Sequence, residues 1–157
     1  MSEPTKRKEE IDPETKKFFS ATDITQEPLL IILRAHLLME YYIDQILMAS
    51  LKRGDALKKM GFYNKLLVLK SLQIFPDEVI ESITGLNKVR NHTSHVRDYQ
   101  ISEDDVDKIG KSFGLKYLRI KKDHSGDIKR MLQFALIAPF ISVEMKLKDF
   151  LKVSPTK

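Results

Sequence analysis

The residues best suited to chemistry lie in one short segment, from Arg90 to His95. Asn91 follows the arginine directly, and four residues separate Arg90 from His95. A histidine, with an unperturbed pKa near 6.5, can accept the proton of a ribose 2′-hydroxyl or donate one to a leaving 5′-oxygen. An arginine can hold a phosphate through two hydrogen bonds and stabilise charge that develops in the transition state. These residue types fit metal-independent RNA cleavage, with Arg90 and His95 as the catalytic pair and Asn91 in support.

The helix that must carry Arg90 is predicted to begin at Pro76-Asp77 and to bury its apolar side: Val79, Ile80, Ile83, Leu86 and Val89. At about 100° per residue, Arg90 falls near the middle of this stripe, so its guanidinium should face inward. An unpaired buried charge costs several kcal/mol, so Arg90 needs a partner. The expected partners are Glu40 or Asp44 of another helix, polar groups of a second subunit, or a phosphate ligand.

A long helix is predicted from Pro28 to Lys52, ended by Gly54. Its apolar residues occupy most of its circumference, so several neighbours or a second subunit must cover it. The polar residues His36, Glu40 and Asp44 recur every four positions and form one stripe. This stripe is either exposed or lines a site, and we take its three residues and His92 as supporting candidates.

Four further segments complete the expected fold. A short helix is predicted over Tyr63 to Leu72, and another begins after the capping residue Ser102 and stops near Gly110 or Gly114. Leu115 to Lys121 alternates weakly and is expected to be extended; the last long helix should then run to about Lys152, with a kink at Pro139. The sequence therefore predicts an all-α bundle of about five helices. Residues 25–152 form its domain, with a mobile polar segment over 1–24 and a tail over 153–157.

Composition excludes several classes of protein. The chain has 157 residues, 42% hydrophobic and 31% charged, which suits one globular domain. It contains no cysteine, which excludes disulfides, thiolate nucleophiles and cysteine-built zinc sites. It lacks a dinucleotide-binding glycine fingerprint, a Walker-type phosphate loop and an apolar signal peptide. Charged and polar residues interrupt the apolar stretch Leu29–Met48, so we expect a cytoplasmic protein without a membrane span.

The net charge of +5 is unevenly distributed. Residues 116–157 hold 10 Lys and Arg against 4 Asp and Glu. This excess can attract an anionic partner such as RNA, or it can form a solvated lysine-rich surface.

Two other interpretations of the Arg90–His95 segment remain open. An Arg-Asn-His run at a helix end can be a capping and salt-bridge cluster, because histidines near a helix C-terminus gain from the helix dipole. His92 and His95 can share a helix face and bind a metal with Asp98 or Glu40. No zinc-binding pattern accompanies them, so we predict neither a metal nor a cofactor.

Arg90-Asn91 followed by His95, on an amphipathic helix, resembles the motif of the HEPN superfamily. The order of helices over about residues 25–150 is similar too. The resemblance implies an all-α protein, often a homodimer whose two motifs meet at a shared cleft. It also implies a metal-independent endoribonuclease, often a toxin or defence component with an antitoxin partner. HEPN toxins with a nucleotidyltransferase antitoxin commonly continue His-x-Tyr; here Arg97 occupies that tyrosine position, which leaves the antitoxin type open.

A second resemblance points to a different function. Asn91-His92, followed by the segment from Tyr99 to Val106, is similar to the corresponding stretch of the mannitol operon repressor family. That resemblance implies a non-catalytic regulator that binds a protein partner or nucleic acid. In that case His92 is the matched histidine and Arg90 is structural.

Overall fold

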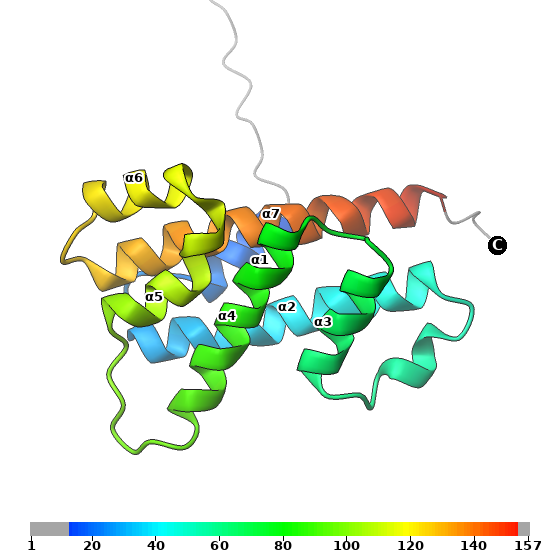
Figure 1. The fold of residues 1–157 in the computed structure, drawn as a ribbon, viewed down its shortest axis with the longest axis horizontal. Helices are drawn as coiled ribbons and strands as arrows, with labels where there is room; N and C mark the ends of the chain where they lie inside the picture. The colour runs from blue at the N-terminus through cyan, green and yellow to red at the C-terminus, as the bar shows by residue number, and fades with distance from the viewer. Residues whose placement is uncertain (1–12, 154–157) are drawn as a thin grey trace, which may run out of the picture.

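The computed structural model describes residues 13–153, and in this range the chain forms helices and no strand (Figure 1). The expectation of an all-α protein is confirmed, whereas the count of about five helices is too low, because the described residues contain 7 α-helices. They are α1 (Pro13–Ala21), α2 (Pro28–Ser50), α3 (Phe62–Ser71), α4 (Asp77–Thr93), α5 (Glu103–Gly110), α6 (Leu115–Asp123) and α7 (Ile128–Val153), with two short 3-10 helices, η1 (Gly54–Leu57) and η2 (Lys111–Phe113).

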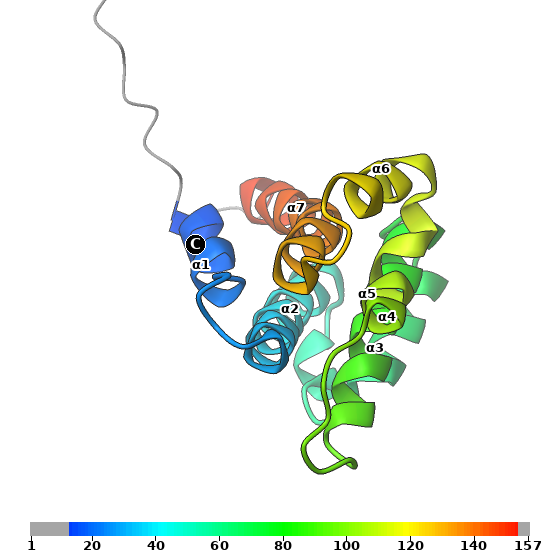
Figure 2. The same cartoon turned by 90° about the vertical axis from the view of Figure 1, so that its left-hand side faces the viewer.

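Helices α2 and α7 form the centre of the bundle and pack side by side (Figures 1 and 2). Their buried apolar side chains supply much of the core, and removing this surface from water is the main force that holds the helices together. On α2 these residues are Ile31, Ile32, Ala35, Met39, Tyr42, Ile43, Ile46 and Leu47; on α7 they are Met131, Leu132, Ala135, Leu136, Phe140, Val143 and Leu147.

Helix α4 packs against α2 and carries α3, α5 and η2 beside it (Figure 2). Its N-terminal turn contains Asp77 and Glu78, which interact favourably with the positive end of the helix dipole. The predicted side faces the core, because Val79, Ile80, Ile83, Leu86 and Val89 are all buried. The C-terminal end of α4, which carries Arg90, therefore lies near α2 and the start of α3.

Helix α5 begins where the sequence predicts. Ser102 accepts a hydrogen bond from the backbone N–H of Asp105, and the Asp105 carboxylate accepts one from the backbone N–H of Ser102. This reciprocal capping box satisfies two donors that the first turn of a helix otherwise leaves free. The helix ends at Gly110, one of the two expected positions.

The expectation of an extended segment over Leu115 to Lys121 is wrong, because these residues lie in α6. Tyr117 is buried against Gly110 and donates a hydrogen bond of 2.6 Å to Asp107 Oδ1. Lys121 also donates to Asp107, at 2.8 and 3.0 Å. Leu115 and Leu118 are exposed, so the apolar alternation does not mark a buried face. The segment is rich in Leu, Lys and Arg, which favour a helix, and the contacts with α5 hold that helix in place.

The N-terminal segment also differs from expectation. Pro13–Ala21 forms α1 and belongs to the fold, although residues 1–24 were expected to be mobile. Phe18 is buried and stacks on Phe140 of α7, with 4.3 Å between ring centroids. Residues 1–12 and 154–157, which include most of the predicted tail, lie outside the described residues. Across residues 13–153, none of the helices has the combination of length and apolarity that crossing a membrane requires.

Candidate functional site

A polar hollow opens where α2, α3 and α4 meet. Its volume is about 400 Å³, and its residues come from the middle of α2, the start of α3 and the end of α4. They are His36, Glu40, Gly61, Phe62, Tyr63, Asn64, Asn87, Arg90 and Asn91. Two residues of the polar stripe on α2 therefore do line a cavity together with the arginine of the motif.

Arg90 lies at this hollow half-buried and without a carboxylate partner. Its guanidinium donates a hydrogen bond of 3.0 Å to Asn91 Oδ1. It forms no ion pair with any residue in the range 13–153. The remaining guanidinium donors are therefore available to an anionic ligand that enters the hollow, and a phosphate matches their planar geometry.

Glu40 or Asp44 was one of the expected partners of Arg90, beside a second subunit or a phosphate, and within residues 13–153 neither carboxylate pairs with it. Both bind Lys65 of α3, whose Nζ lies 2.7 Å from Asp44 Oδ1 and 3.5 Å from Glu40 Oε1. Lys65 is only 1% exposed, so its charge needs these partners more than the half-exposed Arg90 does. Asp44 does not line the hollow, whereas Glu40 does.

His36 is buried at the inner wall of the hollow. Its Nε2 donates to Asn87 Oδ1 at 3.0 Å, and its ring packs against Phe62 with 4.5 Å between centroids. Burial lowers the pKa of His36; the hydrogen bond to Asn87 and the charge of Glu40 oppose this effect, and the charge of Arg90 adds to it. The imidazole is therefore neutral at pH 7, with its Nε2 proton directed to Asn87.

His95 does not line the hollow. It follows α4 in an exposed turn, and its backbone N–H bonds to the His92 carbonyl at 3.1 Å. Thr93 and Ser94 close the end of the helix, since both hydroxyls donate to the Arg90 carbonyl, at 2.8 and 3.0 Å. The structure thus brings Arg90, Asn91, His36 and Glu40 together and places His95 outside them, beyond the end of the same helix.

His92 is exposed and packs edge-on against Tyr99, with 4.8 Å between ring centroids and 85° between ring planes. The Tyr99 hydroxyl donates to Asp105 Oδ2 at 2.7 Å, and Asp105 belongs to the capping box of α5. These contacts join the end of α4 to the start of α5. No group of three or more histidine or acidic side chains in residues 13–153 is arranged to hold a metal ion.

Two polar residues that shape the hollow, Lys65 and Asn87, were not among the candidates expected from the sequence. Lys65 lies on the apolar side of α3 with Phe62, Leu66 and Leu69, and a charge in such a stripe signals a buried ion pair. Asn87 likewise lies on the buried side of α4, four residues after Ile83. A buried amide on an apolar side needs a hydrogen-bond partner, and here that partner is His36.

Comparisons with protein-family models, curated proteins and solved structures find no match for this chain.

Proposed function

We propose that this protein is a metal-independent endoribonuclease of the HEPN type that acts as a homodimer. The observation that carries the proposal is the Arg90 guanidinium, which faces an open polar hollow while both nearby carboxylates are bound to Lys65. A free guanidinium with an adjacent amide is suited to hold the phosphate that will be cut. The Arg-Asn-x3-His motif at the end of α4 supports the same reaction.

In the proposed reaction, Arg90 and Asn91 bind the scissile phosphate and His95 transfers the proton. The ribose 2′-oxygen attacks phosphorus as a histidine removes its proton, and the bond from phosphorus to the 5′-oxygen breaks. The leaving oxygen receives a proton from an imidazolium, so the products are a 2′,3′-cyclic phosphate and a 5′-hydroxyl. An RNA strand held by Arg90 and passing the end of α4 reaches the exposed His95. A second copy of the chain supplies the facing motif.

The test is cleavage of mixed RNA in EDTA by wild type, Arg90→Ala and His95→Ala. We expect wild type to produce 5′-hydroxyl ends and both variants to lose activity by about 100-fold or more. Arg119→Ala and His124→Ala, both on or beside α6, are matched controls that should retain it. His36→Gln belongs in the series because His36 lies in the hollow. If His36→Gln loses more activity than His95→Ala, the proton-transfer role assigned to His95 is wrong.

The homodimer is tested by light scattering. A particle of twice the chain mass of 18.2 kDa is expected at micromolar concentration. A mass near that of one chain contradicts the shared cleft. A neighbouring antitoxin gene would favour a toxin or defence role.

A second candidate is a non-catalytic regulator similar to the mannitol operon repressor family. The contacts of His92 with Tyr99, and of Tyr99 with Asp105, favour it, because the residues of that resemblance form one structural unit. Absence of RNA cleavage by wild type, or equal cleavage by wild type and both variants, would select this candidate. A neighbouring sugar-transport operon would favour it as well.

A further inference from the structure

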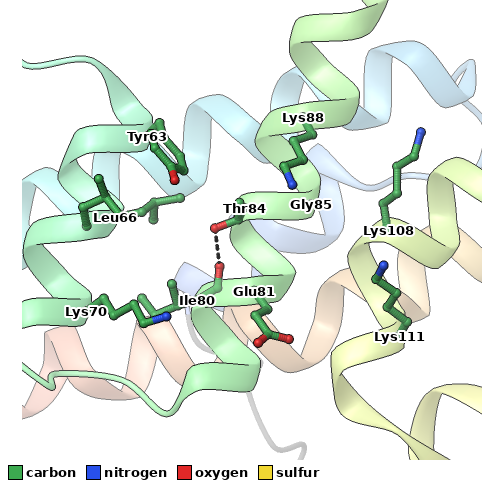
Figure 3. A pocket seen from close by; sticks show the side chains of 11 residues that line it. Tyr63, Leu66, Lys70, Ile80, Glu81, Thr84, Gly85, Lys88, Lys108 and Lys111 are labelled. Carbon is green, nitrogen blue, oxygen red and sulfur yellow. Dashed lines mark hydrogen bonds between the residues drawn. The ribbon is translucent and has the colours of Figure 1, made fainter.

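A second cavity, which we name the lysine groove, lies between α3, α4, α5 and η2 (Figure 3). Its volume is about 350 Å³. Figure 3 shows α4 as its floor, with α3 on one side and α5 on the other. Its charged lining consists of Lys70, Lys88, Lys108, Lys111 and Glu81. Lysines from four separate elements therefore converge on one cavity.

Most of this positive charge is not neutralised within the described structure. Lys108 pairs with Asp105, with 3.1 Å between Nζ and Oδ1. Lys70, Lys88 and Lys111 form no ion pair with any residue in the range 13–153. Like charges gathered around a cavity repel one another and raise the local concentration of anions, so the groove is suited to a polyanion.

The remaining lining supplies apolar and aromatic surface. Leu66, Leu67 and Ile80 line the groove with Tyr63, whose side chain is about half exposed. Gly85 forms part of the floor, and a Cβ there would overlap the Lys108 carbonyl. This glycine lets the backbone of α5 at Lys108 approach α4 closely. A cationic rim around an exposed aromatic ring is the arrangement that binds single-stranded nucleic acid.

The lysine groove also adjoins the polar hollow. Tyr63 lines both cavities. On α4, Thr84, Gly85 and Lys88 face the groove, and Asn87, Arg90 and Asn91 face the hollow. A single-stranded nucleic acid that occupies the groove is thereby directed to Arg90.

We propose that the lysine groove binds the single-stranded RNA that flanks the scissile phosphate, with a base stacked on Tyr63 and phosphates bound by Lys70, Lys88 and Lys111. This assignment rests on the proposed function for its direction toward Arg90. It differs from the sequence-based expectation, which assigned RNA attraction to the basic residues after position 115.

The test measures binding of a labelled single-stranded RNA by fluorescence anisotropy over a series of salt concentrations. The protein carries His95→Ala in every sample, so that the RNA stays intact. We expect Lys88→Gln/Lys111→Gln to weaken binding roughly tenfold at low salt and to reduce the slope of log affinity against log salt by about 0.7 per lysine. The matched control is Lys116→Gln/Lys122→Gln on α6, with the same change in net charge and both side chains exposed.

Tyr63 is tested separately. Tyr63→Leu should weaken binding roughly tenfold without changing the salt slope, whereas Tyr63→Phe should bind like the parent, because stacking needs the ring and not the hydroxyl. Circular dichroism establishes that each variant is folded.

Three outcomes would refute RNA binding by the lysine groove. They are equal weakening of RNA binding in the α6 control, an unchanged salt slope in the groove variant, and displacement of RNA by an equal concentration of polyglutamate. The two proposals fail separately. RNA binding that depends on the groove lysines, without RNA cleavage by wild type, would refute the nuclease proposal and support RNA binding by the lysine groove. RNA cleavage by wild type, together with unaltered RNA binding by the groove variants, would refute RNA binding by the lysine groove and support the nuclease proposal.

Discussion

Replacing Lys65 with methionine should destabilise the fold by about 3 kcal/mol. The Lys65 side chain is 2% exposed and lies between the carboxylates of Asp44 and Glu40, which are 24% and 34% exposed. Breaking a buried ion pair on one side costs about 3–5 kcal/mol, because the other charge stays desolvated. We take the lower end of this range since both carboxylates keep part of their hydration. For a chain of this size the melting temperature should fall by roughly 6–12 °C.

Urea unfolding followed by circular dichroism measures this loss at neutral pH. A double-mutant cycle with Asp44→Leu isolates the interaction, and the combined variant should recover about 1–3 kcal/mol relative to the sum of the two single changes. Lys70→Met, an exposed lysine of the same helix, is the matched control and should change stability by less than about 0.5 kcal/mol. Strict additivity in the cycle, or equal losses of stability in Lys65→Met and Lys70→Met, would show that the buried ion pair of Lys65 does not stabilise the fold.

Two further predictions concern the floor of the groove and the wall of the hollow. Gly85→Ala should cost about 2 kcal/mol in urea unfolding, because the added methyl group overlaps the Lys108 carbonyl. Gly61→Ala, where a Cβ meets nothing within 4 Å, should be nearly neutral, and equal losses would contradict this account. Burial lowers the pKa of His36 below its ordinary 6.5, so the unfolded chain binds this proton more tightly. Stability should therefore fall as pH drops below about 6.5. His36→Gln should reduce the dependence of unfolding free energy on pH below about 6.5, and His124→Gln should leave it unchanged. The same pH dependence in both variants would show that His36 is not the group responsible.

Helix starts were predictable from the sequence where their signals are local. Pro28, Pro76-Asp77 and Ser102 each stand at or next to the first residue of a helix, and capping depends on residues within one turn. Helices α1 and α6 were not predictable in this way. The first depends on Phe18 reaching Phe140, and the second on Tyr117 covering Gly110. In each case the partner residue belongs to another helix, so the contact leaves no periodic signal within the short segment itself.

Some of the residues that line the hollow were predictable from the sequence. The spacing of His36 and Glu40 indicated a polar stripe, and the apolar stripe of α4 placed Arg90 on the same side of the bundle. The ion pairs were not predictable, because the choice between Lys65 and Arg90 as partner of the carboxylates depends on which cation is more deeply buried. Lys65 is the more deeply buried of the two, and its desolvation must be compensated first.

Helix α3 links the two cavities through the different directions of its side chains. Lys65 turns toward α2 and neutralises Asp44 and Glu40, whereas Tyr63 and Lys70 face the lysine groove. If Lys65 is removed, Glu40 is released within the hollow that Arg90 shares, where it competes with phosphate for the guanidinium. Lys65→Met should therefore weaken RNA binding even at temperatures where the variant is folded. Lys88→Gln/Lys111→Gln removes two phosphate contacts and should reduce the salt slope by about 1.4, whereas Lys65→Met affects only the contact made by Arg90 and should reduce it by about 0.7 at most. Comparison of the two salt slopes separates these effects.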